Sequence, residues 1–289
     1  MSVSRVLTGA SVAVLLACGA CSPQGAGSAS TSPATPNTSA PASTAAVTTP
    51  APATTPLSFE RRTPDVEVSL TLPQQLAAYP AAHQQLFREQ SGTLETFARE
   101  QGPERARAVR EGAPFGPYWN VVRVSSASRS DRLEAFVEEA SEFEGGAHPN
   151  SALSAILIDR RTGATIEPVS LFRSDADFSR LDRALCDAIH AARMQRNEGP
   201  LPADDASTFP CPSWRQSSFV PAPSTIAGKL GGLVFLFSPY AIGPYVEGPY
   251  EVTLPLSAFQ AALKPEYAAD FAGAPVRLPD RPELQTPSV

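Results

Sequence analysis

Histidine is scarce in this chain, and the motifs that most often carry catalysis are missing from its sequence. The three histidines, His83, His148 and His190, are far apart, and none forms the helical pair that zinc proteases use. The sequence has no glycine-rich phosphate loop with the required spacing, and no serine stands in a strand-to-helix nucleophile elbow. The sequence therefore predicts no catalytic residue, no cofactor and no metal site, although this leaves an enzyme as an open alternative.

Charge is almost missing from the N-terminal region, where Arg5 is the only charged residue before Glu60. The apolar run that follows Arg5 is too short to span a bilayer, so residues 1–17 are interpreted as a cleaved export signal. Leu15-Leu16-Ala17-Cys18 is typical of a lipobox, in which the cysteine is lipidated and becomes the mature N-terminus. Cys21 is the competing lipidation site, and a plain secretory signal with two incidental cysteines is the remaining alternative. Leu15, at the third position before it, favours Cys18.

Residues 18–57 contain no aromatic side chain and consist mainly of Ser, Thr, Ala, Pro and Gly. Such a segment cannot bury enough apolar surface to offset its ordering entropy, so we expect a disordered tether. A coil of about 35 residues spans on the order of 30–35 Å, or ~110 Å if its prolines keep it extended. The segment would hold the folded part near a membrane while allowing it to reach away.

The formal net charge of −6 argues against nucleic acid and anionic membrane surfaces as partners, and it suits a cationic partner. No second hydrophobic stretch is long enough to cross a membrane, because the run at 230–237 has only the length of a strand. The folded part is therefore expected to lie outside the cytoplasm, anchored through the N-terminal lipid.

Besides the pair at the lipobox, the sequence has two cysteines, Cys186 and Cys211. In an oxidising compartment they can form a disulfide that closes a loop of about 25 residues and stabilises the fold by roughly 3–4 kcal/mol. Two separate buried cysteines are the alternative. A metal site is not expected, because each cysteine stands alone and no histidine pair is near.

Hydrophobic periodicity predicts strands and two long helices beyond residue 57. One helix begins at Pro80 and is expected to end near Gly102-Pro103, followed by a short helix or a solvated loop at 104–111. A second helix is predicted at 178–192 and a short one at 259–263, with a long loop at 197–214. Strands are predicted at 66–70, 119–125, 154–158, 233–237 and 251–254. Residues 133–143 fit either a helix or a strand.

Two irregular segments, 145–150 and 237–249, combine glycine and proline with ring side chains. We take five of their residues as candidate ligand-binding residues: His148, Asn150, Tyr240, Tyr245 and Glu247. An exposed histidine can bind a ligand, and tyrosines on a rigid turn offer much contact area for little entropy loss. The competing interpretation is structural, with the histidine capping a strand and the tyrosines forming half-buried edges of the core.

Together these segments resemble the RsiV/PdaC-like extracytoplasmic domain family. The residues that carry the resemblance are Gly145–Asn150, Asp159 with Thr162-Gly163, Leu171-Phe172, and Gly232 through Pro249. The first half resembles the domain that precedes the deacetylase in PdaC, and the second half resembles the C-terminal domain of RsiV, a lysozyme-sensing anti-sigma factor. The resemblance favours a strand at 133–143, and it implies an α+β fold that acts in the cell envelope. The RsiV membrane helix, its sigma-binding segment and the catalytic half of PdaC have no counterpart in this sequence.

The sequence therefore predicts an α+β protein with a mixed or antiparallel sheet, packed helices and two closely apposed subdomains. We expect a PdaC N-terminal-like domain at 58–160, an RsiV C-terminal-like domain at 161–272 and a loose tail at 273–289. The favoured function is noncatalytic, lipid-anchored binding of a cell-wall-related ligand, either a lysozyme-like muramidase or peptidoglycan. An envelope enzyme that acts on cell-wall glycan and a purely structural lipoprotein are the alternatives. Outer-membrane retention is expected if the cell has two membranes, because no Asp follows the lipidated cysteine.

Overall fold

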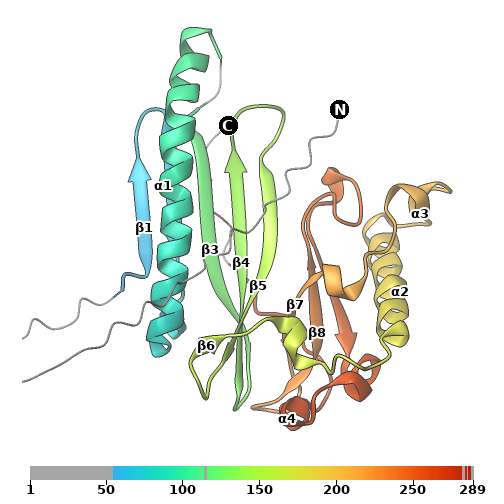
Figure 1. Cartoon of the computed structure of the whole chain (residues 1–289). Helices are drawn as coiled ribbons and strands as arrows, with labels where there is room; N and C mark the ends of the chain where they lie inside the picture. Colours follow the sequence, from blue (N-terminus) through green and yellow to red (C-terminus); the bar gives the residue numbers. More distant parts are fainter. Residues whose placement is uncertain (1–54, 114–115, 282–283, 285, 288–289) are drawn as a thin grey trace, which may run out of the picture. The chain divides into compact units, whose positions relative to one another are not determined.

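The computed structural model describes residues 55–113, 116–281, 284 and 286–287, and the expected export signal, the lipidation site and all but the last three residues of the expected tether lie outside them. The first half of this region forms a six-stranded sheet in the order β1-β2-β3-β4-β5-β6 (Figure 1). Only the β2–β3 pairing is parallel. The strands are β1 (Ser58–Arg62), β2 (Val66–Thr71), β3 (Tyr118–Arg129), β4 (Leu133–Phe143), β5 (Asn150–Asp159) and β6 (Ala164–Thr165).

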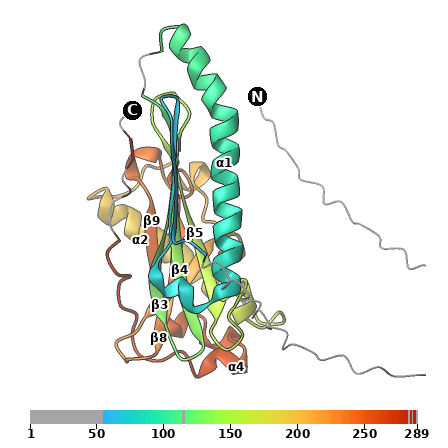
Figure 2. The ribbon, with the colours of Figure 1, turned by 90° about the vertical axis from the view of Figure 1, so that its left-hand side faces the viewer.

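The long helix α1 (Pro80–Arg110) follows a short 3-10 turn, η1 (Gln74–Ala78), and lies along one face of this sheet (Figure 2). The prediction that it ends near Pro103 is wrong, because the helix continues past that proline for two more turns. Proline removes one backbone hydrogen bond. The Arg105 side chain compensates at this end, since it is buried and its Nε donates to the carbonyl oxygen of Gly116 at 2.6 Å.

The segment with two competing periodicities is the strand β4, which pairs with β3 as the resemblance implies. Both faces of this strand are buried. Phe136 and Phe143 belong to the core beneath α1, whereas Leu133, Ala135 and Val137 belong to the core shared with the second half of the chain. A strand that is buried on both faces has apolar residues at consecutive positions, which explains why its sequence also fits a helix.

The second half builds a three-stranded antiparallel sheet in the order β7-β8-β9. Its strands are β7 (Ser218–Pro223), β8 (Leu230–Phe237) and β9 (Tyr250–Pro255). Strand β7 packs against β3 and β5, so the second sheet covers the face of the first sheet opposite α1 (Figure 2). The helix α2 (Ser179–Arg196) packs on β9 and confirms the second predicted helix. The shorter elements are η2 (Pro168–Leu171), α3 (Asp205–Thr208), η3 (Trp214–Gln216), η4 (Tyr245–Glu247), η5 (Leu256–Ala258), η6 (Gln260–Ala262) and α4 (Pro265–Ala268).

The fold therefore confirms the α+β class with a mixed sheet and packed helices. The short helix expected at 259–263 is replaced by the two 3-10 turns η5 and η6. No helix within the described residues is both long enough and apolar enough to span a membrane.

The part of the α2–β7 loop that leads into η3 is tied to α2 at two points. Cys186 on α2 and Cys211 in the loop form the predicted disulfide, with 5.4 Å between their Cα atoms. Three residues further along, the backbone N–H of Trp214 donates to the Asp182 carboxylate at 2.9 Å, and the indole itself is buried. The loop therefore has a second attachment that does not depend on the sulfur–sulfur bond.

Part of the tail that the sequence predicts to be loose is packed in the structure. Leu278 is buried, the backbone N–H of Val276 donates to Pro223, and Arg281 forms ion pairs with Glu139 and Glu251. The paired glycines at the start of β8 allow this packing. A Cβ added at Gly231 would lie 2.3 Å from the carbonyl oxygen of Ala274, closer than such atoms can approach.

We expect the variant Gly231→Ala to lower the free energy of unfolding by about 2–4 kcal/mol, because the added methyl group forces the backbone at Ala274 away from β8. Gly92→Ala is the matched control. Gly92 lies within α1 with open space around it, so this variant should raise stability by about 0.5–1 kcal/mol. Urea denaturation measures both, and equal stability of Gly231→Ala and the wild type would contradict the packing of the tail.

Candidate functional site

The two segments singled out in the sequence become two loops that meet. Residues 144–149 connect β4 to β5, and residues 238–249 connect β8 to β9. The Tyr245 hydroxyl donates to the carbonyl oxygen of Pro149 at 2.7 Å, and the Ser238 hydroxyl accepts the backbone N–H of Leu153 at 3.0 Å. The first bond joins the two loops and the second joins the β8–β9 loop to strand β5, although the partners are about 90 residues apart in the chain.

Three of the five predicted binding residues form one group, which we name the aromatic cluster: His148, Tyr240 and Tyr245. The His148 ring stacks on Tyr245, with 3.7 Å between centroids and an angle of 19° between planes. The Tyr240 ring lies 5.4 Å from Tyr245 and 6.2 Å from His148. Aromatic rings gain about 0.5–1.5 kcal/mol from such contacts beyond the burial of their surface.

Hydrogen bonds fix the orientation of the imidazole in the cluster. His148 Nδ1 lies 2.9 Å from the carbonyl oxygen of Pro149, and Nε2 lies 3.4 Å from the Tyr240 hydroxyl. A neutral ring protonated on Nδ1 satisfies both contacts, because Nδ1 then donates to the carbonyl and Nε2 accepts from the tyrosine. The ring planes are thus set by contacts within the protein.

Tyr240 presents its ring to solvent, with 58% of the residue exposed. Its backbone has a φ of 70°, in the left-handed region that residues with a Cβ rarely adopt. A non-glycine residue in this conformation is destabilised by on the order of 1–2 kcal/mol, and such strain is concentrated at ligand sites. The conformation directs an aromatic side chain outward at a position where glycine would be the less strained residue.

Glu247, the fourth predicted residue, is not part of the aromatic cluster. Its carboxylate accepts two hydrogen bonds from the Arg193 guanidinium, both at 2.9 Å, and further bonds from Asn197 and Tyr250. Arg193 also pairs with Asp205 at 2.6 Å. Only 7% of the Glu247 side chain and 2% of the Arg193 side chain are exposed.

Arg193 and Glu247 strongly favour the ionised state of each other. The hydrogen bonds from Arg193 lower the pKa of Glu247 to about 2, although burial acts in the opposite direction. The same bonds raise the pKa of Arg193. Burial and the hydrogen bond to the Glu247 carboxylate raise the pKa of Tyr250 to about 12. Glu247 therefore holds the β8–β9 loop to α2, while Asn150, the fifth predicted residue, is exposed at the start of β5.

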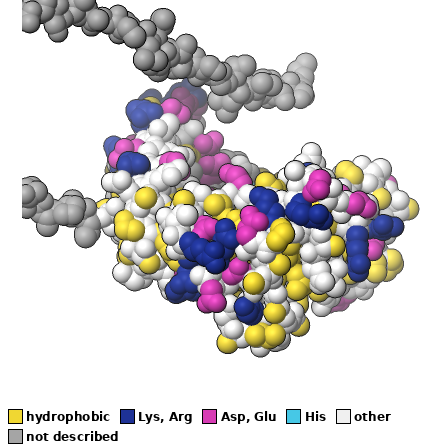
Figure 3. Space-filling model, turned by 60° about the horizontal axis from the view of Figure 1, so that its bottom comes forward, with side chains coloured by type: hydrophobic (Ala, Val, Ile, Leu, Met, Phe, Trp, Pro, Cys, Tyr) yellow, Lys and Arg dark blue, Asp and Glu magenta, His cyan; other side chains and the backbone are white. Residues whose placement is uncertain are grey.

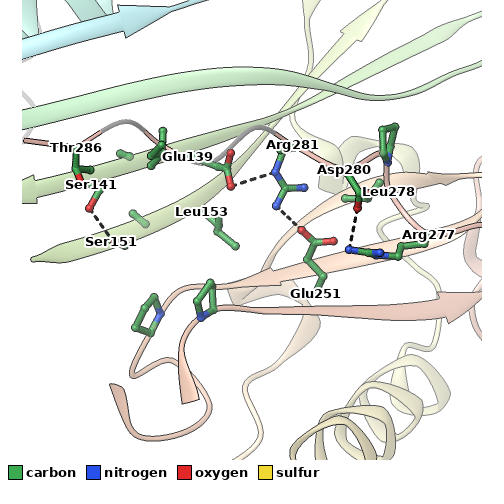
Figure 4. A pocket seen from close by; sticks show the side chains of 16 residues that line it. Glu139, Ser141, Ser151, Leu153, Glu251, Arg277, Leu278, Asp280, Arg281 and Thr286 are labelled. Carbon is green, nitrogen blue, oxygen red and sulfur yellow. Dashed lines mark hydrogen bonds and ion pairs between the residues drawn. The ribbon is translucent and has the colours of Figure 1, made fainter. Parts of the chain in front are cut away.

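A cavity of about 750 Å³ lies between strands β4 and β5, the β8–β9 loop and the C-terminal segment (Figure 4). Ser141, Ser151 and Leu153 line it from β4 and β5, and Pro239 lines it beside Tyr240. Arg281, from the C-terminal segment, connects two of the carboxylates that line it. Its guanidinium lies 3.1 Å from Glu139 of β4 and is hydrogen-bonded to Glu251 of β9, as Figure 4 shows. Burial alone would lower the pKa of Arg281, but the bond to Glu251 and the two negative charges outweigh it and raise the pKa.

A family model matches the segment of the chain that carries Tyr240, Tyr245 and Glu247. Residues 170–257 match the family model described as a protein of unknown function, DUF3298. These residues are a DUF3298 domain. The domain runs from the end of η2 to η5 and contributes two of the three rings of the aromatic cluster, whereas His148 comes from the preceding sheet.

Among the solved structures that match this chain, two DUF3298 family proteins share its fold. A DUF3298 family protein from Pseudomonas aeruginosa PAO1 aligns with a TM-score of 0.50 at 15% identity, over 76% of this chain and 94% of that one. A member of the DUF3298 family from Bacteroides fragilis NCTC 9343 aligns with a TM-score of 0.51 at 13% identity, over 74% of this chain and 95% of that one. The shared fold therefore extends beyond the DUF3298 domain itself. No curated protein matches the sequence.

Sequence reasoning missed two arginines that organise the site, Arg193 and Arg281. Arg193 had a detectable signal, because it occupies the next position after Leu185 and Ile189 on the buried stripe of α2. A charged residue at a core position of an amphipathic helix indicates a buried partner. Arg281 had no such signal, since it lies in an irregular, proline-containing segment.

We expect Glu247→Gln to lower the free energy of unfolding at pH 7 by about 2–4 kcal/mol, because the buried Arg193 loses its main charged partner. The folded pKa of Glu247 is depressed from 4.5 to about 2, so its stabilisation is complete above about pH 5 and is lost as the pH falls toward 2. The wild type should therefore lose on the order of 2–3 kcal/mol more than the variant across this range.

Denaturant titrations at a series of pH values measure the difference. Glu167→Gln, which alters an exposed carboxylate of the DUF3298 segment's N-terminal flank, is the control and should follow the wild type at every pH. If the free energy of unfolding fell equally with falling pH in the wild type and in Glu247→Gln, the ionised Glu247–Arg193 pair would be contradicted.

Proposed function

We propose that this protein is a noncatalytic, lipid-anchored envelope protein that binds the glycan of peptidoglycan through the aromatic cluster. The observation that supports this most directly is the exposed ring of Tyr240, held in a left-handed backbone conformation beside His148 and Tyr245. An aromatic face is an apolar platform, and the C–H face of a sugar ring is an apolar surface of similar size.

The platform is rigid before any ligand arrives. Stacking of His148 on Tyr245 and the bond from Tyr245 to Pro149 fix two rings, and prolines at 239 and 244 restrict the backbone on both sides of Tyr240. A fixed binding surface loses little side-chain entropy on association, which improves affinity. The hydroxyls of Ser141 and Ser151 and the carboxylate of Glu251, in the cavity beside Pro239, offer polar partners for sugar hydroxyls.

A lysozyme-like muramidase is the second candidate ligand, because the net charge of −6 would attract a cationic protein. On the face shown in Figure 3, however, acidic and basic side chains are intermingled and no extended acidic area is present. This face therefore adds no support for a cationic partner, and the glycan is favoured because of the aromatic cluster.

The arrangement of the carboxylates around the cavity gives the enzyme alternative less support than the aromatic cluster gives to glycan binding. Glycoside cleavage commonly uses one protonated and one ionised carboxyl group on opposite sides of the bond. Burial raises the pKa of Glu138, which accepts hydrogen bonds from Gln90 and Ser154. Its neighbour Glu139 faces the cavity, and successive residues of a strand point to opposite faces of the sheet. The carboxyl group with the raised pKa is thus on the other side of β4 from the cavity.

Cellular placement rests on the sequence. The lipidation expected at Cys18 and the RsiV/PdaC resemblance of the two halves support a position at an envelope membrane facing outward, in the outer membrane where the cell has two. The disulfide agrees with an oxidising compartment.

Two substitutions of Tyr240 distinguish the contribution of its ring to ligand binding from that of its hydroxyl. In calorimetric titration with soluble GlcNAc–MurNAc oligosaccharides, Tyr240→Ala should weaken binding about ten-fold, the equivalent of roughly 1.4 kcal/mol of lost stacking. Tyr240→Phe should retain most of the affinity, because the ring remains. Ile226→Ala is the matched control, since Ile226 is 48% exposed in the loop at the opposite end of β8.

A parallel titration uses a panel of lysozymes at low and moderate salt. Salt-sensitive binding of lysozyme without binding of the oligosaccharides would replace the glycan with a muramidase as the ligand. If neither the oligosaccharides nor the lysozymes bound, the proposal would be contradicted. It would also be contradicted if Tyr240→Ala and Ile226→Ala bound the oligosaccharides with equal affinity.

We also expect Cys18→Ser to abolish incorporation of labelled palmitate and to release the protein from the membrane fraction, because the lipidated thiol is lost. Cys21→Ser should remain lipidated and membrane-bound. The opposite result would assign the anchor to Cys21.

A further inference from the structure

We propose that Cys186, His190 and Cys211 form a redox-gated metal site that binds Zn²⁺ when the disulfide is reduced. The site goes beyond the proposed glycan binding and uses none of its residues. All three side chains are half-buried, so reductant and metal ion can reach them from solvent.

The three donor atoms are already grouped around one position. Cys186 and His190 are one turn apart on α2, which places them on the same side of the helix. Cys211 Sγ lies 3.6 Å from His190 Nε2, and all three donor atoms lie within 4.8 Å of one another. Zinc bonds of ~2.3 Å to sulfur and ~2.0 Å to nitrogen at a tetrahedral angle give an S–N edge of about 3.5 Å. The imidazole thus already stands at the ligand–ligand distance of a zinc tetrahedron.

The second attachment of the loop keeps the cysteines close after reduction. The Asp182 carboxylate accepts the backbone N–H of Trp214 at 2.9 Å and the hydroxyl of Ser213 at 3.3 Å. The buried indole of Trp214 packs against Phe172 and Phe178, with centroid distances of 5.0 and 4.5 Å. These contacts do not involve sulfur, so breaking the disulfide leaves Cys211 beside α2.

The chemistry of the donors selects the metal. A phosphine reductant cleaves the sulfur–sulfur bond, is oxidised to the phosphine oxide with the oxygen of a water molecule, and leaves two thiols that carry the two protons of that water. Binding of Zn²⁺ then releases both thiol protons to solvent, and the two thiolates and the neutral imidazole become the ligands. Two soft thiolates and one imidazole favour Zn²⁺ over Mg²⁺ or Ca²⁺, and a water molecule completes the fourth position. Metal binding and the disulfide exclude each other, so the metal stabilises the reduced form.

Cobalt titration tests the site, because Co²⁺ bound tetrahedrally to thiolates gives a charge-transfer absorption and strong ligand-field bands. The full chain carries Cys18→Ser and Cys21→Ser in every sample, since that Cys-x-x-Cys pair could bind metal itself. We expect one equivalent of Co²⁺ to bind after phosphine reduction, to be displaced by Zn²⁺, and not to bind the oxidised protein. Cys186→Ser should abolish the charge-transfer band, and His190→Ala should weaken binding at least about ten-fold. Asp187→Asn, which alters an exposed carboxylate beside Cys186, should bind as the parent does.

Thiol titration and far-ultraviolet circular dichroism establish the state of the reduced sample. A natively folded protein with two free thiols and no cobalt band would overturn the proposal. Loss of the native spectrum on reduction would also overturn it, because the contacts of Asp182 and Trp214 would then fail to hold the loop. If His190→Ala bound Co²⁺ as tightly as the parent does, His190 would not be a ligand and the proposed three-ligand site would be overturned.

Discussion

Both candidate sites depend on the ion pairs that the Arg193 guanidinium forms with two carboxylates. The guanidinium is buried at the end of α2 and holds two loops through their carboxylates, Glu247 in the β8–β9 loop and Asp205 in the loop that precedes β7. The first loop carries Tyr240 and Tyr245, and the second carries Cys211. Gly243 lies so close that an added Cβ would be 2.8 Å from Arg193 Nε, so the loop backbone packs directly on this group. Because the charges are removed from water, each one requires its partners, and the loops cannot move away independently.

A second constraint comes from the central strands of the first sheet. Strands β4 and β5 separate two cores, one beneath α1 and one shared with the β7–β9 sheet. Both halves of the chain therefore stabilise the same sheet, and the hairpin loop that carries His148 is placed against the β8–β9 loop by that packing. The aromatic cluster is a consequence of how the two sheets meet, since neither sheet supplies all three rings.

The two proposed sites combine a rigid support with accessible chemistry. Rings fixed by stacking and proline form a surface suited to a ligand with an apolar face, while the disulfide next to His190 lies in a loop that remains anchored without it. The first site would define what the protein binds in the envelope, and the second would let the redox state of that compartment alter the same DUF3298 domain. Both rely on local geometry that the buried ion pairs maintain.

The sequence by itself predicted the class of the fold, the two long helices and most of the strands, and it favoured the pairing of Cys186 with Cys211 over two separate cysteines. The helices and most of the strands follow from periodicity and turn residues, which act over short stretches of chain, whereas the class of the sheet and the strand at 133–143 were implied by the family resemblance. It also located the two glycine–proline segments, and three of their five candidate residues do meet. The extension of α1 past Pro103 was missed because a side chain 11 residues from its partner, Arg105 to Gly116, supports the final turns.

Only the tertiary structure decided which candidates face solvent and which are buried. Glu247 and Tyr245 are two residues apart, yet one pairs with Arg193 and the other stacks on His148. The packing of the tail through Leu278 and Arg281, and the approach of His190 to Cys211, were equally hidden from the sequence. The physical reason is the same in each case. The partner lies on another element, and its position depends on how two sheets and a helix pack rather than on the local pattern of residues.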